Sequence, residues 1–394
     1  MSSEICFHNA TVLTGYSSMN NCAVLLKDYK IIDVFNETRF SSKHFKDDIR
    51  FIDMQGAYIA PGFMDTHIHG IGGRGTDDMT AASILKMSEI LPRYGVTSFI
   101  PTLYSAPKPQ LLKAIRAVVE ATGKETGAKI LGIHLEGPFI SPDRLGVQNP
   151  ESLSPVDLKY MDEILEAAQG HIINMTVAPE LKNMRELALY CVSKGIVLQA
   201  GHTNATYDQM VEGMQVRILH TTHLFNAMSR MHHRDPGTVG AVFIHPEMSC
   251  ELIADGIHIN PNFIKFLLRC KPLDKLVLVT DSLKTTGQTE GPLIANGDEV
   301  YLDKCFYRKS DNVIAGSALT MIEGVKNLVS FGLSLEQAVQ MASTNPAKIM
   351  RREHLGLIAP GYDADLVAFN KKFDILYTII NGKILKEGKT PCAF

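Results

Sequence analysis

Two histidines separated by one residue, His67 and His69, have the residue type and spacing of a metal-binding pair. They lie in the segment Pro61–Gly70, which reads PGFMDTHIHG. Side chains alternate between the two faces of an extended strand, so Asp65, His67 and His69 share one face. Two imidazoles on one face can bind a divalent cation and leave its other side open to water and substrate. Histidines in a half-buried strand also serve as ordinary hydrogen-bonding residues, so the pair alone is compatible with both roles.

Four further residues able to bind a metal or move a proton stand at the ends of apolar segments. They are Glu136, His202, His223 and Asp281. Burying a carboxylate or an imidazole is unfavourable unless a metal ion or another partner compensates it. A purely structural role for all of them is therefore hard to support, and the set predicts a metal site.

The elements that position these residues are eight apolar, β-branched segments with helical patterns between them. The segments are Ile59–His67, Val96–Pro101, Ile130–Glu136, Ile172–Ala178, Ile196–Gly201, Ile218–His223, Cys250–Ala254 and Leu276–Asp281. Amphipathic helices are predicted at Leu111–Thr122, Pro155–Ala168 and Met184–Lys194. Alternating strands and helices predict a parallel sheet. Eight such units close into a (β/α)8 barrel, whose active site lies at the C-terminal strand ends. An open, doubly wound sheet is the alternative.

Both ends of the chain are β-rich and predict a second, smaller domain. Residues 1–57 contain short alternating segments separated by polar turns, and residues 360–394 have the same character. In the second region the dipeptide Asn381–Gly382 is typical of a hairpin. We expect the two ends to pair in one β-sandwich and residues 58–359 to form the barrel.

Composition and cysteine usage are those expected of a globular protein in a reducing compartment. Apolar residues make up 45% and charged residues 21% of the 394, which is ordinary for a globular protein. A net charge of −3 provides no general attraction for nucleic acid or an anionic membrane. No segment reaches the ~20 apolar residues of a membrane span, and no signal-peptide pattern is present. The seven scattered cysteines form no CxxC pair and predict reduced thiols, so we expect a cytoplasmic protein.

Several motifs, taken together, resemble those of the amidohydrolase superfamily. They are PGFMDTHIHG at 61–70, LEGPF at 135–139, GHT at 201–203, HLFNAM at 223–228, VTDS at 279–282 and the segment 356–367. The resemblance covers nearly the whole chain. LEGPF combined with HLFNAM and HHRDPG at 232–237 is similar to the branch that deacetylates amino-sugar phosphates. The resemblance implies hydrolysis of N-acetylglucosamine 6-phosphate to glucosamine 6-phosphate and acetate, in amino-sugar catabolism.

The resemblance also implies roles for the strand-end residues. Glu136, His202 and His223 match the family's principal metal ligands, an arrangement that leaves a coordination position for water. Asp281 matches the catalytic aspartate, which takes a proton from the attacking water and returns it to the leaving amine.

The number of metal ions depends on the histidine pair. Some family members use residues matching His67 and His69 for a second metal bridged through the glutamate, so one or two ions per subunit are expected. Zinc is the first expectation, and iron, cobalt or manganese accept the same ligands. The fourth segment ends without a lysine, which argues against the carbamylated site of cyclic-amide hydrolases. His134 shares the strand face of Glu136 and is either a partner of a ligand or a core histidine.

A further set of residues is implied to contact the substrate. These are Val147, Gln148, Asn226, Ala227, Arg234, His258, Ile314, Ala315 and Gly316. A guanidinium suits a phosphate, and the family's arginine at Arg234 binds the sugar phosphate, in some cases from a neighbouring subunit; this predicts a homodimer. A solvated charged loop is the alternative for that segment. Gln148 departs from the pattern, because many relatives carry a histidine there that polarises the acetyl carbonyl.

Two alternatives to this function stay open. A sister enzyme acting on N-acetylgalactosamine 6-phosphate or another N-acyl substrate would use the same machinery. A non-catalytic assembly protein on the same fold is disfavoured, because such proteins usually lose metal ligands that this chain keeps.

Overall fold

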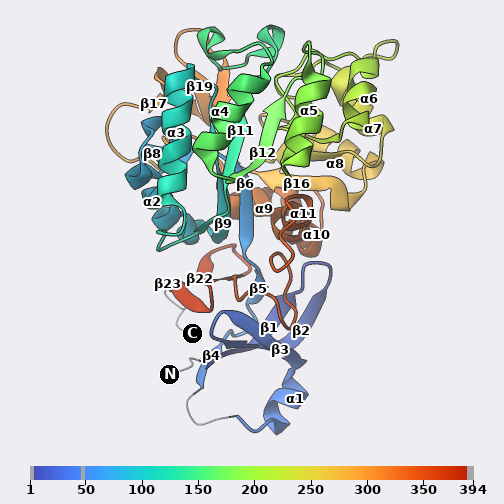
Figure 1. Cartoon of the computed structure of the whole chain (residues 1–394). Coiled ribbons are helices and arrows are strands. Elements are labelled where there is room, and N and C mark those ends of the chain that lie inside the picture. Colours follow the sequence, from blue (N-terminus) through green and yellow to red (C-terminus); the bar gives the residue numbers. More distant parts are fainter. Residues whose placement is uncertain (1–3, 46–48, 388–394) are drawn as a thin grey trace.

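The computed structural model describes residues 4–45 and 49–387, which form a barrel standing on a small β domain (Figure 1). Eight parallel strands, each hydrogen-bonded to the next in chain order, make up the barrel. They are β6 (Phe63–Ile68), β9 (Val96–Leu103), β11 (Ile133–Glu136), β12 (Ile172–Val177), β13 (Val197–Ala200), β14 (Ile218–Thr221), β15 (Ser249–Ile253) and β16 (Leu276–Val279). The predicted fold is confirmed, with one two-residue addition, β10 (Lys129–Ile130), beside β9.

The first and last strands of the barrel meet through residues that belong to the predicted site. The backbone amide of Asp281 donates to the carbonyl oxygen of His67 at 2.9 Å. The hydroxyl of Thr280 donates to Asp65 Oδ2 at 2.6 Å. The open, doubly wound sheet is therefore excluded, and the two strand ends carrying His67 and Asp281 are held together.

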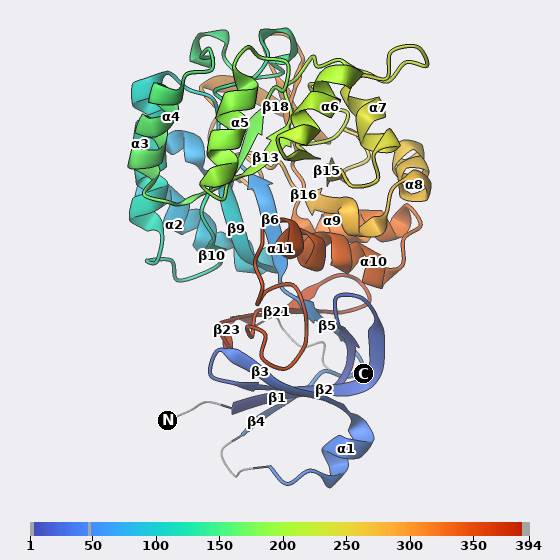
Figure 2. The same ribbon diagram turned by 45° about the vertical axis from the view of Figure 1, so that its right-hand side comes forward.

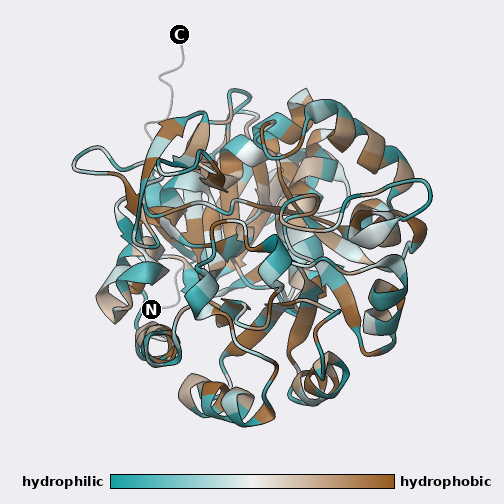
Figure 3. Ribbon diagram, turned by 90° about the horizontal axis from the view of Figure 1, so that it is seen from above, coloured by the Kyte–Doolittle hydropathy of each residue, from teal (hydrophilic) through white to brown (hydrophobic). Residues whose placement is uncertain are grey.

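Helices surround the strands, as the view from above shows (Figure 3). They are α2 (Ala81–Ile90), α3 (Lys108–Ala121), α4 (Leu158–Ala168), α5 (Met184–Ser193), α6 (Tyr207–Gln215), α7 (Gly237–Ile244), α8 (Pro261–Cys270) and α9 (Met321–Ser330). Short 3₁₀ turns lie at Thr76–Asp78, Leu91–Tyr94, Pro142–Arg144, Pro150–Ser152 and Leu273–Lys275. The three helices expected from periodicity are α3, α4 and α5, which are confirmed to within a few residues.

Local sequence explains where these helices begin and which face they bury. Asp157 caps α4 by accepting the backbone N–H of Lys159. Thr206 and Gln209 cap α6 reciprocally, side chain to backbone in both directions. Each amphipathic helix then packs its apolar stripe on the barrel strands, which are buried on both faces.

A bent helical segment closes the N-terminal end of the barrel. Helix α10 (Leu335–Val339) continues through a π-helical turn (Gln340–Thr344) into α11 (Asn345–Ile349). The side-chain amide of Asn345 donates to the carbonyl oxygens of Leu273 and Leu276, both at 2.7 Å. Figure 2 shows α10 and α11 between the barrel strands and the small domain. Access from solvent is therefore through the opposite, C-terminal end of the strands.

The small domain is built from both ends of the chain, as predicted. Its strands are β1 (Glu4–Leu13), β2 (Ser18–Lys27), β3 (Lys30–Asn36), β4 (Arg50–Asp53), β5 (Tyr58–Pro61), β21 (Leu366–Phe369), β22 (Ile375–Ile380) and β23 (Lys383–Glu387), with one helix, α1 (Glu37–Ser42). The two ends join where β21 pairs antiparallel with β5. The segment expected as one strand from Ile59 to His67 is divided, because β5 lies in this sheet and β6 in the barrel.

The sequence did not predict a small antiparallel sheet inserted between β16 and α9. It comprises β17 (Ile294–Ala295), β18 (Asp298–Asp303), β19 (Cys305–Arg308) and β20 (Ile314–Gly316). Residues 314–316, expected to contact the substrate, form β20, and the isolated bridge between Ser282 and Ser317 attaches this end of the sheet beside Asp281. A two-strand hairpin, β7 (Gly70–Ile71) with β8 (Arg74–Gly75), follows the histidine pair.

The described part of the chain contains neither a disulfide nor a membrane span. Its six cysteines are free, and burial raises the pKa of Cys6, Cys191 and Cys250 to about 12, so these three are unreactive thiols. Cys392 lies outside the described residues. Among the described helices, none is long and apolar enough to cross a membrane.

The junction between the two domains depends on a buried aromatic side chain. Phe369 is fully buried and packs against Tyr58 and Phe63, with ring centroids 5.5 and 6.3 Å away. We predict that Phe369→Ala lowers the free energy of unfolding by about 3–5 kcal/mol, because it leaves a cavity there. Urea unfolding measures the loss. Leu385→Ala, at an exposed position of β23, is the matched control and should cost much less; equal losses would contradict this account of the junction.

Candidate active site

The six predicted ligand and catalytic residues meet at the C-terminal mouth of the barrel. His67 and Glu136 lie on β6 and β11, His69 directly follows β6, and the other three come just after the ends of β13, β14 and β16. His202, His223 and Asp281 have positive φ angles of 45°, 25° and 50°. This region is unfavourable for residues other than glycine, and such strain is concentrated at functional sites. The turns after these strands thus direct the side chains into the mouth.

One cluster consists of Glu136, His202 and His223. Glu136 Oε1 lies 3.1 Å from Nε2 of each histidine, and the two Nε2 atoms are 3.1 Å apart. All three residues are buried. These three atoms could hold a metal ion from one side, with the cavity on the other side. This is the arrangement of a catalytic metal site, in which one coordination position stays open.

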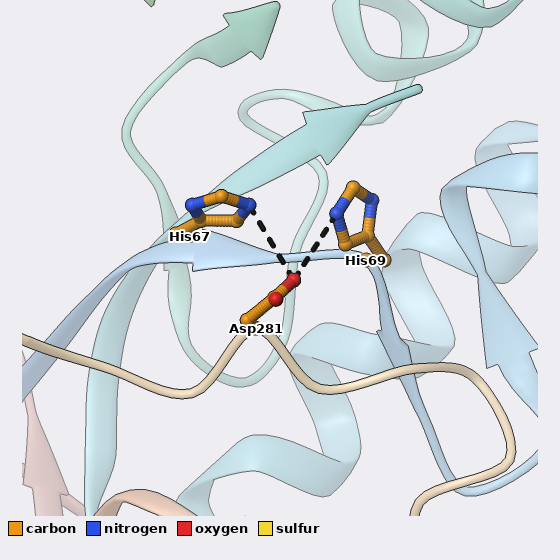
Figure 4. A group of neighbouring side chains, drawn as sticks. All are labelled: His67, His69 and Asp281. Carbon is orange, nitrogen blue, oxygen red and sulfur yellow. Dashed lines mark ion pairs between the residues drawn. The ribbon is translucent and has the colours of Figure 1, made fainter. Parts of the chain in front are cut away.

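A second cluster consists of His67, His69 and Asp281 (Figure 4). Asp281 Oδ1 lies between the two rings, 3.5 Å from His67 Nε2 and 3.4 Å from His69 Nε2. Glu136 joins this cluster to the first, because its two carboxylate oxygens lie 3.4 Å from His67 Nε2 and His69 Nε2. The sequence implied different roles for Asp281 and the histidine pair. In the structure, their side chains form one cluster.

The donor atoms of these clusters fit a divalent cation. His67 Nε2 is buried and has no hydrogen-bond partner among the described residues, although it faces the carboxylates of Glu136 and Asp281. A buried nitrogen in this state is costly unless something else binds it. Imidazole and carboxylate groups that lie this close together are the ligands that zinc and similar metals use.

The carboxylates of the site stay ionised despite their burial. Burial raises the pKa of Glu136, but His202 and the other imidazoles outweigh it and hold the pKa well below its ordinary value. Burial also raises the pKa of Asp281, and His67 and His69 outweigh it, so the net shift is downward. Two ionised carboxylates at neutral pH favour a cation between them.

A cavity of about 270 Å³ opens above the clusters. It is lined by eight of the nine predicted substrate residues: Val147, Gln148, Asn226, Ala227, His258, Ile314, Ala315 and Gly316. The strand β20 of the inserted sheet thus forms part of the wall. His258 is held by Asp255, whose Oδ2 lies 2.6 Å from His258 Nδ1.

Arg234 is the predicted substrate residue that does not line the cavity. It lies exposed in the 230–236 loop, where its Nη1 is 2.9 Å from His233 Nε2. The residues lining the cavity include no lysine and no arginine. In a single chain, therefore, the described cavity lacks a permanent cation for a phosphate group.

Gln148 takes part in the site in a way that the sequence did not predict. It is buried, its amide nitrogen donates to Glu136 Oε2 at 2.6 Å, and its amide oxygen accepts the backbone N–H of Ser105 at 3.1 Å. Gln148 therefore orients the carboxylate that lies between the two clusters.

Other residues near the site were missed or left open by the sequence. Tyr104, which follows β9, stacks on the ring of His69 at 3.7 Å and lines the cavity. Glu251 on β15 is buried beneath the clusters. In the sequence it could have been noticed as a single charged residue inside an apolar segment. His134 is a core histidine bonded to the hydroxyls of Thr102 and Thr176, and burial lowers its pKa to about 3.

Comparison with known proteins agrees with this geometry. The family model of the amidohydrolase family matches residues 58–385. N-acetylglucosamine-6-phosphate deacetylase of Bacillus subtilis (strain 168) is 33% identical over 98% of this chain and 98% of its own. N-acetylgalactosamine-6-phosphate deacetylase of Escherichia coli O157:H7 is 30% identical over 83% of this chain and 87% of its own.

A solved structure shares the whole architecture. The crystal structure of N-acetylglucosamine-6-phosphate deacetylase from Pasteurella multocida superposes with a TM-score of 0.90 at 30% identity, covering 98% of this chain and 100% of that one. The match of the family model to most of the chain, together with the full-length relatives, leads to one conclusion: this protein is a member of the amidohydrolase family.

Proposed function

We propose that this protein hydrolyses the acetamide of N-acetylglucosamine 6-phosphate to glucosamine 6-phosphate and acetate, in amino-sugar catabolism. The observation that carries the proposal is the convergence of two ligand clusters on Glu136 at the floor of the cavity. The relatives that share this architecture over their full length are named for this reaction. The free thiols of the described cysteines agree with the cytoplasmic location expected from the sequence.

We propose Glu136, His202 and His223 as ligands of one metal, and His67 with His69 as ligands of a second that shares Glu136. Zinc suits these donors, and iron, cobalt or manganese would also be accepted. When bound, the metal lowers the pKa of a water molecule and polarises the amide carbonyl of the substrate.

Asp281 is proposed as the group that moves the proton. Its lowered pKa keeps it a carboxylate at neutral pH, and it lines the cavity. Oδ1 accepts a proton from the attacking water and then delivers it to the amine nitrogen. The second transfer is required because an unprotonated amide nitrogen is a poor leaving group.

The cavity walls hold the sugar in this proposal. Asn226 and Ala227 follow the ligand His223 in the chain and line the cavity, as do His258 and β20. Polar groups of this kind orient a sugar, and the apolar side chains among them exclude water from the acetyl group.

The phosphate is proposed to be bound by Arg234 from a second copy of the chain. The cavity needs a cation that its own lining does not supply, and Arg234 is exposed on the 230–236 loop. The apolar side chains of Met231 on that loop and of Phe263 and Phe266 on helix α8 are also exposed. Exposed apolar side chains, together with a guanidinium that does not reach the cavity of its own chain, fit a homodimer interface in which each subunit completes the site of its partner.

N-acetylgalactosamine 6-phosphate is the second candidate substrate, because one relative of comparable identity is named for it. The two substrates differ in one hydroxyl configuration. We predict acetate release from both sugars to favour the gluco epimer in kcat/KM, measured by coupled detection of acetate. Equal or faster turnover of the galacto epimer would assign the protein to that substrate instead, and no release from either would overturn the deacetylase proposal.

Replacing the proton-transferring carboxylate tests the mechanism. Asp281→Asn should lower kcat by about 10²–10⁴-fold, the usual contribution of a general acid–base group, while the metal at Glu136, His202 and His223 stays bound. Acetate release and metal content by mass spectrometry measure the two effects. Loss of that metal in the variant would show that Asp281 acts as its ligand and not as the base.

Mixed dimers test the placement of Arg234. Arg234→Ala alone should raise KM by about 10–100-fold, the value of a charged hydrogen bond. Co-expression with Asp281→Asn should restore turnover with the wild-type KM, because a mixed dimer contains one site with both residues intact. Co-expression of Arg234→Ala with a chain carrying both changes is the control. If the first mixture shows no more turnover than the control, Arg234 serves its own subunit.

A further inference from the structure

Beneath the mouth of the barrel lies a carboxylate that the proposed mechanism does not use. Glu251 is fully buried on β15, where the other side chains of the strand are apolar or uncharged. Burial raises its pKa, but His67 and other groups outweigh it and hold the pKa well below its ordinary value. An ionised side chain at this depth is costly unless its partners compensate it, and the identity of those partners indicates what it does.

One oxygen of Glu251 contacts a residue from each ligand cluster. Oε2 lies 2.8 Å from His67 Nδ1 and accepts the backbone N–H of His223 at 3.1 Å. Oε1 accepts the side-chain amide of Gln199 at 3.2 Å, and His220 Nε2 lies 3.8 Å away. The carboxylate thus lies directly behind the second cluster and is hydrogen-bonded to the backbone of the first.

The contact with His67 determines which nitrogen of that ring is free. A carboxylate is an acceptor, so Nδ1 carries the hydrogen and Nε2 keeps its lone pair. Nε2 is the atom that faces Glu136 and Asp281. We infer that Glu251 is a positioning residue, which fixes the tautomer and ring orientation of His67 for the second metal. This inference rests on the ligand set proposed above.

The other three imidazoles are held differently among the described residues. His202 Nδ1 donates to the backbone carbonyl of Arg144 at 3.0 Å. His69 Nδ1 and His223 Nδ1 have no hydrogen-bond partner, and His69 is held by stacking on Tyr104. His67 therefore has the carboxylate partner that most increases the basicity of a ligand, and the affinity of its subsite should depend on Glu251.

A variant of a neighbouring buried residue can distinguish the positioning role of Glu251 from a purely structural one. Asn174 on β12 is fully buried, and its amide donates to Gln199 Oε1 at 3.1 Å. It makes no hydrogen bond to any of the six cluster residues. Asn174→Leu therefore removes a polar group from the layer while leaving both clusters untouched, which makes it the matched control for Glu251→Met.

The experiment measures zinc binding to the purified full chain without substrate. Zinc content after dialysis, and zinc affinity against a competing chelator, are compared for the wild type, Glu251→Met, Asn174→Leu and His67→Ala. We expect two zinc ions in the wild type and in Asn174→Leu, and loss of one in His67→Ala. In Glu251→Met the second zinc should bind about 10–100-fold more weakly, while the first keeps its wild-type affinity.

Three outcomes would overturn the inference: wild-type affinity for both ions in Glu251→Met, an equal loss in Asn174→Leu, or a wild type with a single zinc. If Glu251→Met does not fold, Glu251→Gln takes its place. The glutamine must turn its amide oxygen to His67 and then sets its NH₂ against that of Gln199, so a smaller weakening of the second zinc is expected and an unchanged affinity would contradict the inference. Failure of the deacetylase proposal appears separately, as absent acetate release by a wild type that binds two zinc ions.

Discussion

The position of the Glu136 carboxylate, between four imidazoles at the mouth of a closed barrel, is the interaction on which the rest of the site depends. Its Oε1 faces His202, His223 and His67, and its Oε2 faces His69. A buried carboxylate of this kind is unfavourable by itself, and it becomes favourable only when cationic partners surround it. The donor set therefore behaves as one unit, in which moving any strand end would leave charge uncompensated.

Barrel closure is what brings this unit together. His67 and Asp281 are more than two hundred residues apart in the chain, yet the backbone bond between them joins the first and last strands. The hydrogen bond from Thr280 to Asp65 lies directly below this backbone bond. Because the far end is closed by α10 and α11, these polar groups meet the described cavity at the C-terminal mouth of the barrel.

Much of the fold was predictable because its signals are local. Apolar β-branched segments with amphipathic helices between them specify strands and helices by periodicity alone, and all eight barrel strands lie where this pattern places them. The division of Ile59–His67 was not visible, since both halves are apolar and extended. The inserted sheet was missed because its strands are short and partly polar, and their alternation does not differ from that of a long loop.

By itself, the sequence determined the residue types at the strand ends and hence the class of chemistry, because ligand identity is a property of side chains. Tertiary structure alone decided how those residues are grouped: Asp281 with the histidine pair, Gln148 on Glu136, Glu251 behind His67, and Arg234 away from the cavity of its own chain. Such groupings depend on distances of a few ångströms between segments remote in sequence. Closure of the barrel sets those distances, and no local pattern records them.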